Sequence, residues 1–262
     1  MNGLGFATVR RASLLIVLLV VAVGLSGAAR AATHSPLRSS CKIAPKNAWT
    51  NCPRANLAGR KLPHADLRNA NLAGANLTGA TLTQANLATA NLTRAKLARA
   101  RLDNANLAFA SFAGAASAGA NFSRATLNGA NLAHANLSGA DLSRANLVGA
   151  SLVDANLSHA NLALANLAGA NLEGANLTGA NLNTAALVGT NFSHANLTRA
   201  TLANATLSGA YLIGANLSGA NLVGVTVMGA DLSKATLAGA KLGNTAWNGS
   251  ICPNGRKAKT RC

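Results

Sequence analysis

The sequence predicts an all-β solenoid of stacked, four-sided coils, and two periodic features support this prediction. Between residues 57 and 242 a leucine recurs at every fifth residue without an insertion, at 33 of 38 such central positions. Alanine stands two residues before 35 of these positions, and glycine is the commonest residue two residues after them. A period of five matches neither the 3.6-residue turn of a helix nor the two-residue alternation of a strand, so the chain must turn once per repeat.

Glycine in the fifth place, as at Gly74 and Gly139, suits the positive φ of a type II turn. Four such turns close a coil of about 20 residues with Leu and Ala inside, and coils would stack about 4.8 Å apart through strand-like hydrogen bonds. Each coil buries its apolar layer only against its neighbours, so both ends need caps. We therefore expect repeats over 55–246, an N-terminal disulfide cap over 32–54 and a C-terminal disulfide cap over 247–262.

Residues 1–31 have the features of an export signal. Arg10 and Arg11 precede an apolar run over 13–27, and Ala29-Arg30-Ala31 fits the small-residue cleavage pattern. The alternative is an uncleaved anchor, because Ala12 to Ala29 is 18 residues, the lower limit for a spanning helix. We expect a secreted or cell-envelope protein, held by an N-terminal membrane anchor if the signal is not cleaved.

The four cysteines, Cys41, Cys52, Cys252 and Cys262, flank the regular region in two pairs. Three connectivities are possible. A long rigid body between the pairs favours Cys41–Cys52 and Cys252–Cys262, which would staple the two ends of an exported protein. A zinc site is the alternative, but neither pair has a second pair of ligands nearby.

The repeat Ala-Asn/Asp-Leu-X-X over roughly 55–246 resembles the pentapeptide-repeat family. That resemblance implies a right-handed quadrilateral β-helix, here of about nine to ten coils. The tail 247–255 with Cys262 is similar to the disulfide-closed ending of some exported bacterial members. Arg60 in an inward place, with Pro63 beside it, departs from the pattern and predicts an irregular first coil.

Ser117 is a small polar residue at a central position, between the central residues Phe112 and Phe122. A large, small, large succession would keep the volume of the core constant. We interpret the three residues as compensating one another; a decayed repeat is the alternative.

Taking every twentieth residue reads out the faces of such a coil. One column is wholly hydroxylic and lies beside a column of asparagines, which together form a possible docking face for a polar ligand such as a glycan: Ser138, Ser158, Thr178, Thr198 and Ser218, beside Asn136, Asn156, Asn176, Asn196 and Asn216. A second column is mildly apolar and lies beside glycines, which suits pairing of two rods: Val148, Ala168, Val188, Ser208 and Met228, beside Gly149, Gly169, Gly189, Gly209 and Gly229. The simpler alternative is that the fold tolerates such residues outside.

Positive charge is concentrated at both ends of the chain. The whole sequence carries 23 Lys and Arg against six Asp and Glu. The densest cluster, Arg94, Lys96, Arg99 and Arg101, is a possible site for an anionic polymer, or else a solubilising surface. No aromatic residue lies among these basic residues, so stacking on single-stranded nucleic acid has no support.

The best-known activity of the resembled family, DNA mimicry against type II topoisomerases, depends on an acidic rod, whereas this chain is basic and predicted to be exported. Catalysis has no support either, because His64, His134, His159 and His194 occupy outward places and the only expected contact is a surface pair of His134 with Asp154. We expect no enzyme, no cofactor, no metal and no small-molecule substrate. The sequence favours a secreted scaffold that presents rigid faces to proteins or anionic or polar envelope polymers, as a monomer or homodimer. A purely structural envelope spacer is the alternative.

Overall fold

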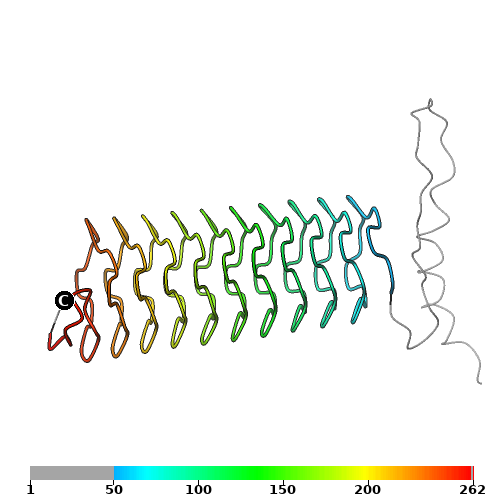
Figure 1. The fold of residues 1–262 in the computed structure, drawn as a ribbon. Helices are drawn as coiled ribbons and strands as arrows, with labels where there is room; N and C mark the ends of the chain where they lie inside the picture. Colours follow the sequence, from blue (N-terminus) through cyan, green and yellow to red (C-terminus); the bar gives the residue numbers. More distant parts are fainter. Residues whose placement is uncertain (1–49, 261) are drawn as a thin grey trace, which may run out of the picture. The chain divides into compact units, whose positions relative to one another are not determined.

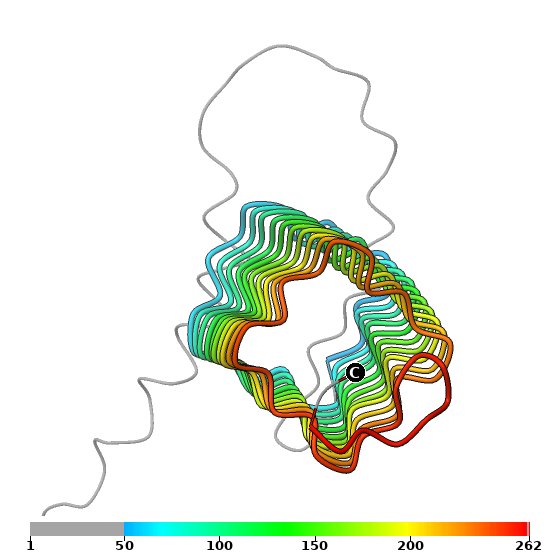
Figure 2. The same cartoon turned by 90° about the vertical axis from the view of Figure 1, so that its left-hand side faces the viewer.

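The chain divides into two units, Met1–Arg38 and Ser39–Cys262, and the computed structural model describes residues 50–260 and 262. The described part of the second unit is a succession of similar coils stacked in one direction (Figure 1). After a quarter turn the coils lie over one another (Figure 2). The predicted export signal and Cys41 lie outside the described residues. Within those residues no helix is long and apolar enough to cross a membrane.

Parallel bridges between residues 20 positions apart hold the coils together. They run from Asn51↔Asn71 to Asp231↔Ile251, with one bridging residue in every five. The predicted 20-residue coil is therefore confirmed. Residues 50–260 form no helix and no strand longer than one bridging residue, so the β character consists of isolated bridges rather than the strand-like pairing that we expected. The ladder also continues beyond residues 55 and 246 at both ends.

Asparagine before the central residue satisfies a backbone group that the coil leaves over. In the repeat beginning at Asn176, three N–H groups donate to carbonyls of adjacent coils, and Ala180 N–H donates to Leu177 O across the turn at 3.0 Å. The remaining N–H, that of Thr178, donates to Oδ1 of Asn176 at 3.1 Å. The same bond recurs at every Asn or Asp in this place from Asn56 to Asp231. This need explains the Ala-Asn/Asp-Leu motif.

The corner residue, two after each centre, adopts a positive φ as predicted, but glycine is not required there. In the described residues 21 non-glycine and 20 glycine residues have positive φ, among them Phe109 (58°) and Leu164 (62°). A large corner side chain instead affects the next coil. A Cβ on Gly129 would lie only 2.5 Å from Cε1 of Phe109. Glycine at that corner therefore provides room as well as backbone freedom.

The core is a column of central leucines and small alanines, fully buried through the middle of the stack. Phe112 and Phe122, ten residues apart, meet across the core edge to face with their ring centroids 5.8 Å apart. Ser117 between them is buried, and its hydroxyl has no hydrogen-bond partner among the described residues. The two rings thus fill the space that the serine leaves. Thr190, in an alanine place, is buried too, but its hydroxyl donates to Leu167 O at 2.8 Å.

The first coil keeps a regular backbone, so the predicted irregularity at Arg60 is wrong. Lys61 bridges Thr81, and Arg60 N–H donates to Leu57 O at 3.1 Å. What differs is burial, because Arg60 is exposed and Leu57 and Leu62 are only partly buried. The turn depends on backbone groups, which arginine supplies as alanine does.

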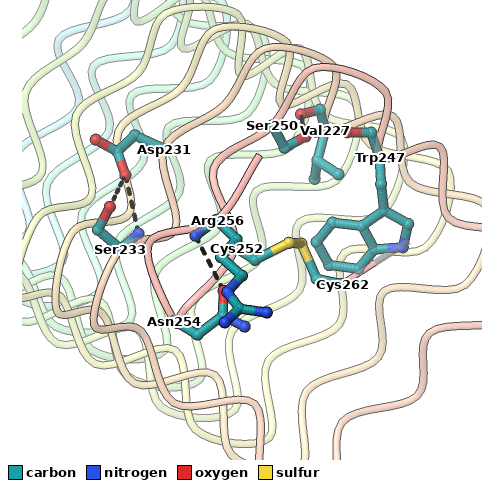
Figure 3. Close-up of a disulfide and its surroundings, with 9 residues drawn as sticks. All are labelled: Val227, Asp231, Ser233, Trp247, Ser250, Cys252, Asn254, Arg256 and Cys262. Carbon is teal, nitrogen blue, oxygen red and sulfur yellow. Dashed lines mark hydrogen bonds between the residues drawn. A yellow bond between two sulfur atoms is a disulfide. The ribbon is translucent and has the colours of Figure 1, made fainter. Parts of the chain in front are cut away.

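A hairpin held by a disulfide closes the C-terminal end. Ile251 pairs antiparallel with Lys257, and Cys252 and Cys262 form the predicted disulfide with Cα atoms 5.4 Å apart (Figure 3). Trp247 is buried beneath this hairpin, with 3% of its surface exposed. Pairing the chain with itself covers part of the open edge of the stack.

The two cysteines nearest the coils occupy central positions themselves. Cys52 and Cys252 both follow the five-residue register, and both are buried. Cys52 is disulfide-bonded, while its expected partner, Cys41, lies outside the described residues. The link between those two residues stays a prediction.

Candidate functional site

The coil presents its outward residues in columns, which define two opposite faces. We call the columns of residues 56, 58 and 59, continued every 20 residues, the polar face. We call the columns of residues 66, 68 and 69, continued in the same way, the smooth face. The two faces are half a coil apart, like Phe112 and Phe122, whose rings meet from opposite sides of the core.

The polar face carries the predicted hydroxyl and asparagine columns in an ordered ladder. Asn136, Asn156, Asn176, Asn196 and Asn216 are joined by consecutive bridges. Asn156 Nδ2 donates to Asn136 Oδ1 at 3.3 Å. The hydroxyls of Thr178, Thr198 and Ser218 donate to the Oδ1 of the neighbouring asparagine at 2.7, 2.6 and 2.6 Å. Their oxygens therefore remain available as acceptors toward solvent.

The basic cluster lies on the same face, at its N-terminal end. Lys96 bridges Asn76 and Ala116, so it stands in the column that continues to Asn136. Arg99 occupies the corner of this face and is exposed, with its Cγ beside the place where a Cβ on Gly119 would lie (3.9 Å). The sequence analysis treated the basic cluster and the hydroxyl column as separate sites; counting residues 96 and 136 in steps of 20 would have joined them.

The other two basic residues of the cluster flank the polar face. Arg94 lies on the preceding corner and is exposed. Arg101 begins the following column, where its Nε lies 3.4 Å from Oδ1 of Asp103. Asp103 partly neutralises Arg101, so Arg94, Lys96 and Arg99 are the more effective positive charges.

No acidic residue stands in the columns of the polar face. All six are on other columns: Asp66, Asp103, Asp141, Asp154, Glu173 and Asp231. Arg199 adds a positive charge to the corner column of Arg99, farther along the stack. The polar face is therefore positive at one end, hydroxylic along its length and free of negative charge.

The smooth face gathers exposed apolar side chains. Val148, Val188 and Met228 are 38%, 47% and 47% exposed, and Phe109, on the corner of this face, is 64% exposed. Between them lie Ala168 and Ser208, with glycines along the corner beyond Phe109.

Its only charged residues in the described coils are Asp66 and Arg68, at the N-terminal end. Arg68 Nη2 donates to Asp66 Oδ2 at 2.8 Å, and Nε donates to Oδ1 at 2.9 Å. Arg68 holds the pKa of the Asp66 carboxyl below its ordinary value, chiefly through these side-chain hydrogen bonds. The face as a whole is neutral.

The described residues form no recognisable catalytic or metal constellation. The expected surface pair is present, with His134 Nδ1 3.8 Å from Asp154 Oδ2, and both side chains are mostly exposed. Across residues 50–260 and 262 there is no group of three His, Cys, Asp or Glu side chains that could hold a metal ion.

Comparison with known proteins agrees with this architecture. The pentapeptide-repeat profile matches in eight copies over residues 50–88, 85–116, 120–158, 155–193, 190–227 and 210–245. No curated protein sequence matches significantly. HetL, a pentapeptide repeat protein involved in heterocyst differentiation regulation from the cyanobacterium Nostoc sp. strain PCC 7120, is 34% identical. The match covers 76% of this chain and 92% of HetL, with a TM-score of 0.59. QnrB1, a plasmid-mediated fluoroquinolone resistance protein, is 20% identical over 74% of this chain and 92% of its own, with a TM-score of 0.45.

Proposed function

Because the chain belongs to the pentapeptide-repeat family, whose members are typically non-enzymatic scaffolds, we propose that it binds an anionic, hydroxyl-bearing polymer along its polar face. We further infer export, from the signal features over 1–31, so the ligand would be a polymer of the cell envelope. The right-handed sense of the coils and their number, nine to ten, are part of the same proposal.

The observation that carries the proposal is that basic residues and hydroxyls share one acid-free face. Lys96 stands in the asparagine column, and Arg94 and Arg99 occupy the corners on either side of that stretch. The hydroxyl column begins two coils farther on, at Ser138. An extended polymer following the stack would meet cationic groups first and hydroxyl acceptors next.

The donor and acceptor chemistry of the face favours a ligand with two kinds of group. Exposed guanidinium and ammonium groups bind phosphate, sulfate or carboxylate. The hydroxyls of Thr178, Thr198 and Ser218 already donate to asparagine and so offer acceptors, which suit the hydroxyl groups of a polyol or sugar. The polar face has no aromatic side chain, so stacking on uncharged sugar rings contributes nothing there.

Retention on an immobilised polyol phosphate tests the proposal. The variant Lys96→Gln/Arg99→Gln removes two positive charges from the polar face, and retention at low salt should fall about ten-fold, since each well-placed contact to a charged group contributes roughly 1 kcal/mol or more. The matched control, Arg124→Gln/Arg144→Gln, removes the same charge from another corner column and should bind nearly as well as the parent. Both variants should keep the parent's melting temperature, since all four residues are exposed.

The hydroxyl column is tested separately. Thr178→Val/Thr198→Val should weaken binding of the polyol phosphate but leave binding of a simple polyphosphate, which lacks hydroxyl groups, unchanged. Equal loss in both charge variants, with complete release at about 0.3 M salt, would indicate non-specific attraction, because exposed charges are then screened. No retention by the parent at low salt would favour the alternative of a structural spacer.

A further inference from the structure

We infer that two copies of this chain pair back to back through their smooth faces, in antiparallel orientation, with the twofold axis at Ala168. The pairing would leave the two polar faces pointing in opposite directions. A dimer of this kind has two equivalent polymer sites and can bridge two polymer chains; the bridging, unlike the pairing itself, rests on the proposed function.

Charge selects the smooth face for self-association. The chain is strongly basic, so contact between two copies through most surfaces would bring like charges together. The polar face would set Lys96 and Arg99 against their own copies, and the column of Arg124 and Arg144 would do the same. From residue 86 to residue 249 the smooth face has no charge. It is the surface of the described coils on which two copies meet without repulsion, and it exposes Val148, Val188 and Met228.

The side chains of the smooth face fit one register. With the axis at Ala168, residue 148 of one copy faces residue 188 of the other, so each valine meets a valine. Asn128 meets Ser208, and the exposed ring of Phe109 falls on Gly229, beside Met228. Moving the axis to Val188 would place Phe109 beyond the end of the partner's stack. The common coil spacing lets all these contacts form together.

The expected area predicts a weak dimer. The uncharged stretch spans nine coils, about 40 Å at the bridge spacing, and one side of a coil spans about 13 Å of extended chain. Two such surfaces bury about 1,000 Å², at the lower end of the range for specific interfaces. We therefore expect reversible, concentration-dependent association.

The mass of the purified protein in solution, measured by sedimentation in moderate salt, tests the pairing. We expect a mass approaching twice that of the monomer at about 100 µM and a monomer at about 1 µM, as suits a small interface. Val148→Lys/Val188→Lys places lysines opposite each other twice and should weaken association at least ten-fold. The matched control Val153→Lys/Val223→Lys adds the same charge on other columns and should dimerise like the parent. Melting temperatures of both variants report that the fold is kept.

A charge swap tests the orientation. In the antiparallel register, Val148→Lys/Val188→Glu sets each lysine opposite a glutamate and should restore most of the association. In a parallel pair the like residues would face one another, and association would stay lost.

The outcomes that overturn the inference are distinct. A parent that is monomeric at 100 µM, or a Lys/Lys variant that still dimerises, excludes the smooth face. Failure of the Lys/Glu variant to recover, when the Lys/Lys variant dissociates, excludes the antiparallel register. The monomeric Lys/Lys variant should still bind the polyol phosphate, so failure of the pairing and failure of the proposed function are separable.

Discussion

The polar face and the smooth face are built on the same backbone and present different surfaces. Both have one bridging residue in five, a central leucine that is fully buried through most of the stack and a corner residue with positive φ. They differ only in the columns that point outward. Packing and hydrogen bonding therefore determine the inward places, while the outward columns are free to vary. Binding properties of such a coil are encoded with a period of 20 residues, and its fold is encoded with a period of five.

Asparagine illustrates why the two levels must be separated. Asn176 on the polar face and Asn166 on the smooth face each accept the N–H group two residues ahead at 3.1 Å. An asparagine column is thus a structural feature of both faces. What distinguishes the polar face is the hydroxyl column and the basic residues, and what distinguishes the smooth face is the column of Val148, Val188 and Met228.

The largest expected effect comes from the core that the two faces share. Leu157, behind the polar face, and Leu167, behind the smooth face, are both fully buried. Substitution of either by Asp buries an unpaired carboxylate and should cost roughly 3–5 kcal/mol, unfolding the neighbouring coils. Far-UV circular dichroism and the melting temperature measure the loss.

The two substitutions should be equivalent. If Leu157→Asp were tolerated while Leu167→Asp unfolded the protein, the two faces would not share one core. The control Ser158→Asp changes an outward residue next to Leu157 and should leave the melting temperature within about 2 °C of the parent, as surface changes usually do.

Much of the fold follows from the five-residue period, because one buried leucine per turn leaves few other ways to arrange the chain. The 20-residue coil, the positive φ at the corner and the Cys252–Cys262 link were predicted in this way. The role of asparagine was not, since the N–H group that it satisfies is identified only when the hydrogen bonds of the whole coil are known. Leu164 and Phe109 at positive φ were also not foreseen, because local preference disfavours them and bonding between coils overrides it.

The candidate site was predicted in pieces. The residues of the basic cluster and of the hydroxyl column were identified correctly as outward, but their position on one face depends on the coil register. Exposed side chains follow no packing rule, so their ligand leaves no periodic signal in the sequence. Arg60 shows the opposite error: a residue that breaks the sequence pattern need not break the backbone.

The next prediction concerns the acceptor that both faces use. Asn176→Ala removes the partner of the Thr178 N–H group and should cost about 0.5–1.5 kcal/mol. On the smooth face Ala186 stands in the asparagine place, so Ala186→Asn should supply an acceptor for Val188 N–H and stabilise by a similar amount. Chemical denaturation measures both changes. Opposite signs of the two effects support a purely structural role for this column; equal signs would contradict it.

The smallest expected effect concerns the charged end of the smooth face. The pKa of Asp66 is lowered from its ordinary value of 3.8, mainly by the hydrogen bonds from Arg68. A lowered carboxyl pKa stabilises the folded state above the unfolded pKa, and this contribution is lost as the pH falls through the lower folded-state pKa. Asp66→Asn should therefore lower the melting temperature by about 1 °C at pH 7, because exposed pairs contribute little, and the difference should vanish in acid. A difference that persisted unchanged in strong acid would show that the pair is not its source. Residue 68 lies outside the stretch that overlaps in the antiparallel dimer, so the same variant should associate like the parent at pH 7. Loss of association would require a register in which Arg68 meets the partner.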